Sequence, residues 1–176
     1  NMSSEGAMPA AGPRLHHLTT WFDPESAAVV TILLGLFQVL LSVPLAYSEQ
    51  NLPKIFFLPL VIGILVMAGG SFTLANERNP SRQLLKGCAC SNVAGLLGAL
   101  IAFCLYCYSL NTAQNKDPCI PISSHDDFSP SPSFCPGEIL MTYSWSVTLL
   151  LLLHDIGAMI MHSLLSLSAL KALKTD

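Results

Sequence analysis

Charged residues are scarce in this chain: Asp, Glu, Lys and Arg together make up 11% of its 176 residues. Soluble domains carry about a quarter of such residues, and 52% hydrophobic residues lie on the membrane side of the globular range. Also missing are a catalytic triad, a phosphate-binding loop and a set of metal ligands. The sequence therefore does not indicate an enzyme, and we expect no cofactor, no metal and no nucleic-acid partner.

What the chain has instead is four long apolar stretches. Each could cross a hydrocarbon core of about 30 Å as a helix, and none alternates like a membrane strand. We predict an all-α integral membrane protein with a four-transmembrane-helix bundle. The predicted segments are a mobile tail at 1–25, a transmembrane domain at 26–170 with helices at 26–48, 55–75, 87–110 and 138–170 and an outer loop at 111–136, and a short tail at 171–176.

The basic residues indicate the orientation of the spans. Because cytoplasmic segments carry the excess of Lys and Arg, the side with more of these residues is the cytoplasmic one. Both termini and the 76–86 loop are therefore predicted to be cytoplasmic. The six basic residues on that side are Arg14, Arg78, Arg82, Lys86, Lys171 and Lys174, against Lys54 and Lys116 on the other.

The outer loop at 111–136 is rich in Pro, Ser and Asp, so we expect it to be irregular and exposed. It contains Cys119 and Cys135. On the oxidising side of a membrane, two cysteines in one loop favour a disulfide, worth on the order of 3 kcal/mol. The alternative is two free thiols.

The other four cysteines fall in the third span. Cys88 and Cys90 follow Lys86 at the predicted cytoplasmic end, where they are candidates for palmitoylation or simply small interfacial residues. We interpret Cys104 and Cys107 as two buried cysteines that behave as small apolar side chains inside a helix. The alternative function is a membrane thiol oxidoreductase that passes electrons between this pair and the pair formed by Cys119 and Cys135.

Small residues recur along the second and third spans. Such residues let helix backbones approach closely, which is how membrane helices associate when apolar burial gives no driving force. We predict that they pack helices within the chain or between copies of it. In the third span they are Gly87, Ser91, Gly95 and Ala99 at every fourth position, with Ala94, Gly98 and Ala102 beside them; in the second span they include Gly69 and Gly70.

Polar residues at membrane depth are few: Gln38, Asn92, His154, Asp155 and His162. An ionised aspartate at a helix centre costs roughly 2.5 to 3.5 kcal/mol on insertion scales, so Asp155 is expected to face the bundle, to be protonated or to have a partner. We favour a role as a polar contact between helices or subunits. The alternative is an ion channel component that involves Asp155.

Several motifs resemble the membrane-spanning 4-domains subfamily A family, which includes the B-lymphocyte antigen bound by rituximab and the beta chain of the high-affinity IgE receptor. Leu34–Leu40 (LGLFQVL) is similar to the family's L-G-x-x-Q-I pattern. Gly70-Ser71 with Glu77–Gly87 (ERNPSRQLLKG) resembles the family's Gly-Ser, acidic-basic pair and Lys/Arg-Gly run. Asn92, the His154–Asp155 pair and the two loop cysteines also fit. Pro59–Gly63 (PLVIG) departs from the family's Pro-Phe-Trp-Gly.

The resemblance implies a multi-pass plasma-membrane accessory protein without enzymatic activity. Such a protein assembles as a dimer or higher homo-oligomer, or with receptor membrane proteins, and modulates cell-surface and immune signalling, often including calcium entry. A sterol or another lipid between helices is a further candidate partner.

Overall fold

The computed structural model describes residue 15 and residues 22–48, 57–114 and 136–175. These residues form four helices: α1 (Pro24–Ser48), α2 (Phe57–Arg78), α3 (Arg82–Gln114) and α4 (Pro136–Thr175). Each helix is long and apolar enough to cross a membrane, and the described residues contain no strand. The predicted all-α, four-span architecture is confirmed.

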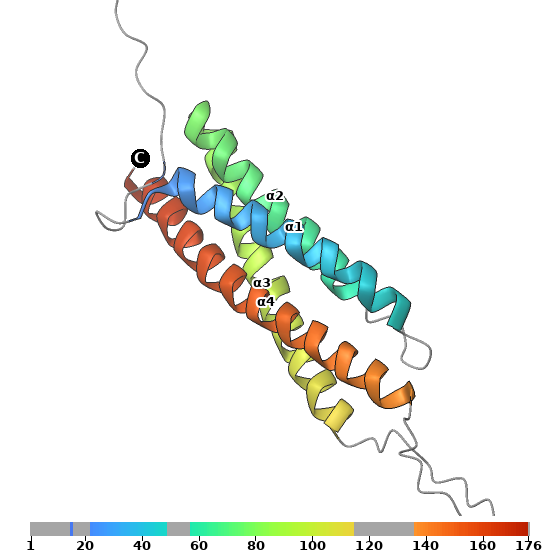
Figure 1. Ribbon diagram of the computed structural model, residues 1–176. Coiled ribbons are helices and arrows are strands. Elements are labelled where there is room, and N and C mark those ends of the chain that lie inside the picture. Colours follow the sequence, from blue (N-terminus) through green and yellow to red (C-terminus); the bar gives the residue numbers. More distant parts are fainter. Residues whose placement is uncertain (1–14, 16–21, 49–56, 115–135, 176) are drawn as a thin grey trace, which may run out of the picture.

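The helices are arranged as a ring in chain order. α1 packs on α2, α2 on α3, α3 on α4 and α4 back on α1, while α2 and α4 also touch across the centre. The start of α1 and the end of α4 lie at the same end of the bundle (Figure 1). We call this the inner end, because it carries the predicted cytoplasmic residues, and the opposite end the outer end.

The connection between α2 and α3 is much tighter than the predicted 76–86 loop. α2 ends at Arg78 and α3 begins at Arg82, so α3 starts before the predicted Gly87. Ser81 caps α3: its Oγ accepts the N–H of Leu84 at 3.1 Å and its carbonyl accepts the N–H of Leu85 at 2.9 Å. Pro80, which cannot continue α2, precedes this cap.

α3 and α4 are longer than a bilayer core requires. They contain 33 and 40 residues, which corresponds to roughly 50 and 60 Å against a core of about 30 Å. The predicted tail at 171–176 is helical as far as Thr175, and the first residues of the predicted outer loop are helical as far as Gln114. Both helices therefore extend beyond the hydrocarbon layer.

The buried side of each helix follows a seven-residue repeat. The spacing alternates between three and four residues, which is the pattern of helices packed at a small crossing angle in a bundle. Buried positions are 28, 31, 35, 38, 42 and 45 in α1; 59, 62, 66, 69, 73 and 76 in α2; 85, 88, 92, 95, 99, 102 and 106 in α3; and 151, 155, 158, 162, 165, 169 and 172 in α4.

α1 and α2 approach most closely at glycines. A Cβ atom at Gly35 would lie 2.6 Å from the carbonyl oxygen of Gly63, and one at Gly70 would lie 2.8 Å from that of Ala28. Real Cβ atoms do not come this close, so a larger residue at either position would separate the two helices.

Leu15 lies against the inner end of the bundle, although it falls in the segment predicted as a mobile tail. Its side chain is buried with Leu85, Cys88 and Ala172 from α3 and α4. Its N–H donates to the Glu77 carboxylate at 3.1 Å. The chain ahead of α1 is thus attached to the bundle at this residue.

Candidate functional site: two buried polar clusters

The first polar cluster joins α2, α3 and α4 toward the inner end. His162, Asn92 and Thr73 are fully buried. The Nδ1 atom of His162 lies 2.9 Å from Oδ1 of Asn92, and Nδ2 of Asn92 lies 3.0 Å from Oγ1 of Thr73. Three helices are therefore connected through the Asn92 side chain. We call these three residues together with Cys88 the His162 cluster.

The donors of the His162 cluster can be assigned by elimination. The Thr73 hydroxyl donates to the Gly69 carbonyl at 2.8 Å, so the Cys88 thiol, 3.2 Å away, must donate to Thr73. The Asn92 amide nitrogen donates to the Thr73 hydroxyl and to the Cys88 carbonyl at 2.9 Å. Its oxygen is then an acceptor, which places a proton on Nδ1 of His162.

The imidazole of His162 fits between two glycines. A Cβ atom at Gly69 of α2 would lie 2.8 Å from Cε1 of His162, and one at Gly95 of α3 would lie 2.7 Å from the same atom. Both distances are shorter than any tolerated contact, so only glycine leaves room for this ring. The two glycines thus allow a histidine of α4 to reach Asn92.

The second polar cluster lies nearer the outer end and consists of Asp155, Gln38 and Tyr106. All three side chains are fully buried. Asp155 comes from α4, Gln38 from α1 and Tyr106 from α3, and both neighbours lie within electrostatic reach of the Asp155 carboxyl group. No hydrogen bond of standard geometry joins their polar atoms to a described residue, although the Gln38 amide lies close enough to interact with the Asp155 carboxyl group. We call this set the Asp155 cluster.

His154 lies on a different side of α4 from Asp155. Its Nδ1 atom is 2.7 Å from the carbonyl of Leu150, and its ring packs at 5.6 Å between centroids on Phe37 of α1. Both of these rings are partly exposed along the seam between α1 and α4. The adjacent pair His154–Asp155 is therefore split, with one residue at the bundle surface and the other in its interior.

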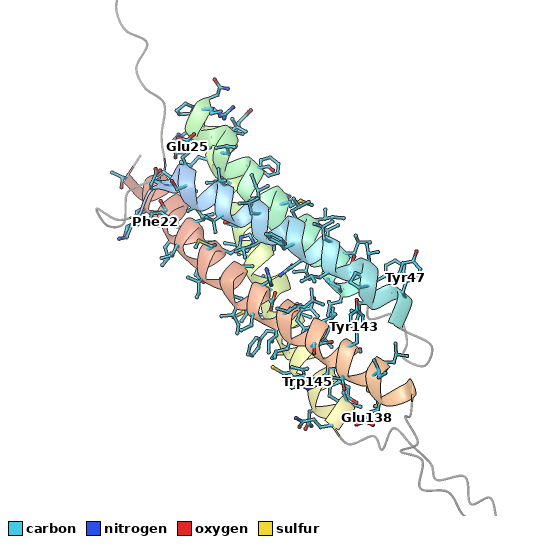
Figure 2. All side chains as sticks on the ribbon, viewed as in Figure 1. Phe22, Glu25, Tyr47, Glu138, Tyr143 and Trp145 are labelled. Carbon is cyan, nitrogen blue, oxygen red and sulfur yellow. The ribbon has the colours of Figure 1, made fainter. Side chains whose placement is uncertain are left out.

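An open pocket of ≈ 400 Å³ lies on the same seam at the outer end. Tyr47 of α1 and Tyr143 of α4 line it, and both lie at this end in Figure 2, opposite Phe22 and Glu25. Apolar walls with two phenol groups are typical of the aromatic belt at a membrane surface. The remaining lining residues are Val43, Pro44 and Leu140.

The four described cysteines are free thiols in different surroundings. Cys88 is buried in the His162 cluster, where no acyl donor can reach it, whereas Cys90 is exposed. Lipid attachment at this end is therefore proposed for Cys90 alone. The prediction that Cys104 and Cys107 are buried is wrong, because both side chains are exposed on α3. Cys119 and Cys135 lie outside the described residues, so the disulfide between them stays a prediction.

The predicted small-residue stripe is divided between two environments. Gly95 and Ala99 are buried in the bundle, while Gly87, Ser91 and Gly98 are partly exposed. The stripe was taken at every fourth residue, whereas the buried face repeats at 3.5 residues, so the two diverge along the helix. Of the predicted polar residues, Asn92 joins the His162 cluster and Gln38 joins Asp155.

Sequence reasoning missed Thr73 and Tyr106 as members of the two clusters, and it named His162 without a partner. A signal for Tyr106 exists: it is two seven-residue repeats from Asn92, on one helical face with Gly95, Ala99 and Ala102. No comparable signal singles out Thr73 among the other hydroxyl residues of the spans.

The four long helices and their buried polar groups define a multi-pass membrane protein. Comparison with family models extends this: the model of the CD20-like family matches residues 26–170. The chain therefore belongs to the CD20-like family, the domain of membrane-spanning 4-domains subfamily A proteins, and the resemblance seen in the sequence is confirmed. A comparison with curated proteins found no match.

Proposed function

We propose that this protein is a non-enzymatic accessory protein of the plasma membrane, with both termini cytoplasmic, that assembles with copies of itself and with receptor chains. Through this assembly it modulates cell-surface signalling, including calcium entry. The support is membership of the CD20-like family together with a surface that its own helices leave uncovered.

The surface that we assign to assembly is the side of α3 that faces away from the other three helices. Only 22% of the most apolar window of α3 is buried within the chain, against 33–39% for the other three helices. Ala94 is exposed on this face between Leu97 and Cys90. A small residue flanked by larger apolar ones is a surface against which a second membrane helix packs closely.

The substitution Ala94→Phe tests this assignment, because its ring would hold a neighbouring helix away from α3. We expect self-association in nanodiscs, measured by light scattering on a size-exclusion column, to weaken about 5- to 30-fold, which corresponds to a loss of 1–2 kcal/mol per interface. The amount of receptor chain that co-purifies with the variant from native membranes should also decrease.

The matched control is Ala75→Phe, which adds the same ring to an exposed alanine of α2. Its self-association should equal that of the wild type. Equal loss in both variants, or a wild-type protein that is monomeric and recovers no receptor chain, would contradict the proposal. Gly95→Leu is not a clean test, because a side chain at Gly95 collides with His162 inside the bundle.

A further inference from the structure

Asp155 is a carboxyl group in the membrane interior, and no described Lys or Arg side chain is buried with it. The buried polar and charged residues of the described chain include no Lys and no Arg. The nearest ionisable group along the buried face of α4 is His162, one seven-residue repeat away and about 10 Å along the axis. Its Nδ1–H is already donated to Asn92. None of the buried residues that the structure describes therefore supplies a cation for this carboxylate.

The side chains around Asp155 leave several oxygen atoms without a partner. Both carboxylate oxygens of Asp155, the amide oxygen and nitrogen of Gln38 and the hydroxyl of Tyr106 are buried and make no hydrogen bond of standard geometry with the described residues. Each such buried atom costs about 1–3 kcal/mol in a protein interior. Because a helical side chain leans toward the start of its helix, Tyr106 is directed inward along α3 toward the level of Asp155.

We propose that these oxygens bind one Na⁺ ion in the centre of the bundle. Carboxylate, amide carbonyl and hydroxyl oxygens are ligands that hard cations prefer. A single carboxylate balances one positive charge, whereas a divalent ion would leave an excess charge in a low-dielectric interior. No group of three His, Cys, Asp or Glu side chains that could hold a metal ion occurs among the described residues. These features favour a monovalent ion over calcium or zinc.

Two buried hydroxyl groups mark a route from the outer end to this site. Ser42 of α1 and Thr148 of α4 lie one to two helical turns outward of Gln38 and Asp155 and are almost fully buried. Each hydroxyl donates its proton to a carbonyl of its own helix, to Val39 for Ser42 and to Ser144 for Thr148. Their oxygen lone pairs therefore remain available to a passing cation. The open pocket at Tyr47 and Tyr143 lies farther out on the same two helices.

The test is equilibrium binding of ²²Na⁺ to the full chain in nanodiscs of zwitterionic lipid. The wild type should bind one ion per chain saturably. Unlabelled Na⁺ should displace it, whereas K⁺ should need about tenfold higher concentration because a carboxylate favours the smaller ion. Ca²⁺ and N-methyl-D-glucamine should not compete. Asp155→Asn should abolish binding, and the unfolding temperature should rise with Na⁺ in the wild type but not in Asp155→Asn.

A matched tyrosine pair guards against misfolding of Asp155→Asn. Tyr106→Phe removes one buried oxygen and should weaken Na⁺ binding about tenfold, whereas Tyr108→Phe alters an exposed ring and should change nothing. Three results would each overturn the proposal: no saturable ²²Na⁺ binding by folded wild type, displacement by Ca²⁺ more readily than by Na⁺, or equal binding by the two tyrosine variants. Oligomer size is measured separately, so neither failure implies the other.

Discussion

At the residue scale, the size of a few side chains determines which polar groups can meet. His162 reaches Asn92 only because positions 69 and 95 carry no side chain on either side of the ring. Gly87, which lies on α3 like Gly95, is less constrained. A Cβ atom at Gly87 would lie 3.8 Å from Phe72, which is an ordinary contact. Position 95 therefore requires glycine, whereas position 87 should tolerate a larger residue.

Gly95→Ala should lower the free energy of unfolding by about 1–3 kcal/mol, the usual cost of overpacking a filled interior. The reason is the 2.7 Å approach of the new methyl group to Cε1 of His162. Reversible unfolding in bicelles measures the loss. Gly87→Ala is the control and should be neutral or slightly stabilising, since alanine is the better helix former; a similar loss in both variants would contradict the assignment.

At the scale of the elements, α3 depends on its first turn. The α2–α3 connection is only a few residues long. Ser81 supplies the cap with which α3 begins, ahead of the apolar part of the helix that crosses the membrane. The early start places Leu85 and Cys88 on the buried face, where they contact α4 and Leu15. The cap thus helps to form the inner end of the bundle.

Ser81→Ala should destabilise the protein by about 1 kcal/mol, because the N–H of Leu84 loses its side-chain acceptor. Hydrogen exchange should become faster at the first amides of α3 and remain unchanged at its centre. Ser71→Ala serves as the comparison, since the exposed Ser71 hydroxyl bonds only to a carbonyl within α2. Unchanged exchange at the first turn of α3 in Ser81→Ala would refute the cap.

The spans could be predicted from sequence because length and hydropathy suffice to locate a membrane helix. Their rotation could not be predicted in the same way: in lipid, leucine and valine are equally suited to the outer and the inner face, so apolar periodicity does not mark the core. Small and polar residues mark it better. Asn92, Gly95 and Ala99 reveal the buried side of α3, whereas the prediction from every fourth residue drifted toward Gly87 and Ser91.

The helix ends were harder to predict. The apolar residues of a span end at the bilayer surface, whereas the helix can continue beyond it. Arg82, Gln83 and Lys86 favoured a loop, yet Ser81 caps a helix that includes all three of them. Leu15 illustrates the same difficulty, since an apolar residue between Arg14 and His16 gives no sign in the sequence that it packs against α3 and α4.

At the scale of the whole molecule, the bundle must be held together without the hydrophobic effect that stabilises soluble proteins. Lipid is as apolar as the helix surfaces, so close packing and interior polar contacts carry the stability. Glycines allow α1 and α2 to pack closely, and the hydrogen bonds of the His162 cluster connect α2, α3 and α4. The exposed faces of the helices remain free for other membrane helices, which is what the proposed assembly requires.

The most direct test of this account is a double-mutant cycle on Asn92 and His162. Asn92→Leu, His162→Leu and the double variant would be compared with the wild type in reversible unfolding of the full chain in bicelles. We predict a coupling energy of about 1 kcal/mol, in the range of polar contacts between membrane helices. Losses that add to within about 0.3 kcal/mol would show that the contact does not hold α3 to α4, and would contradict the account.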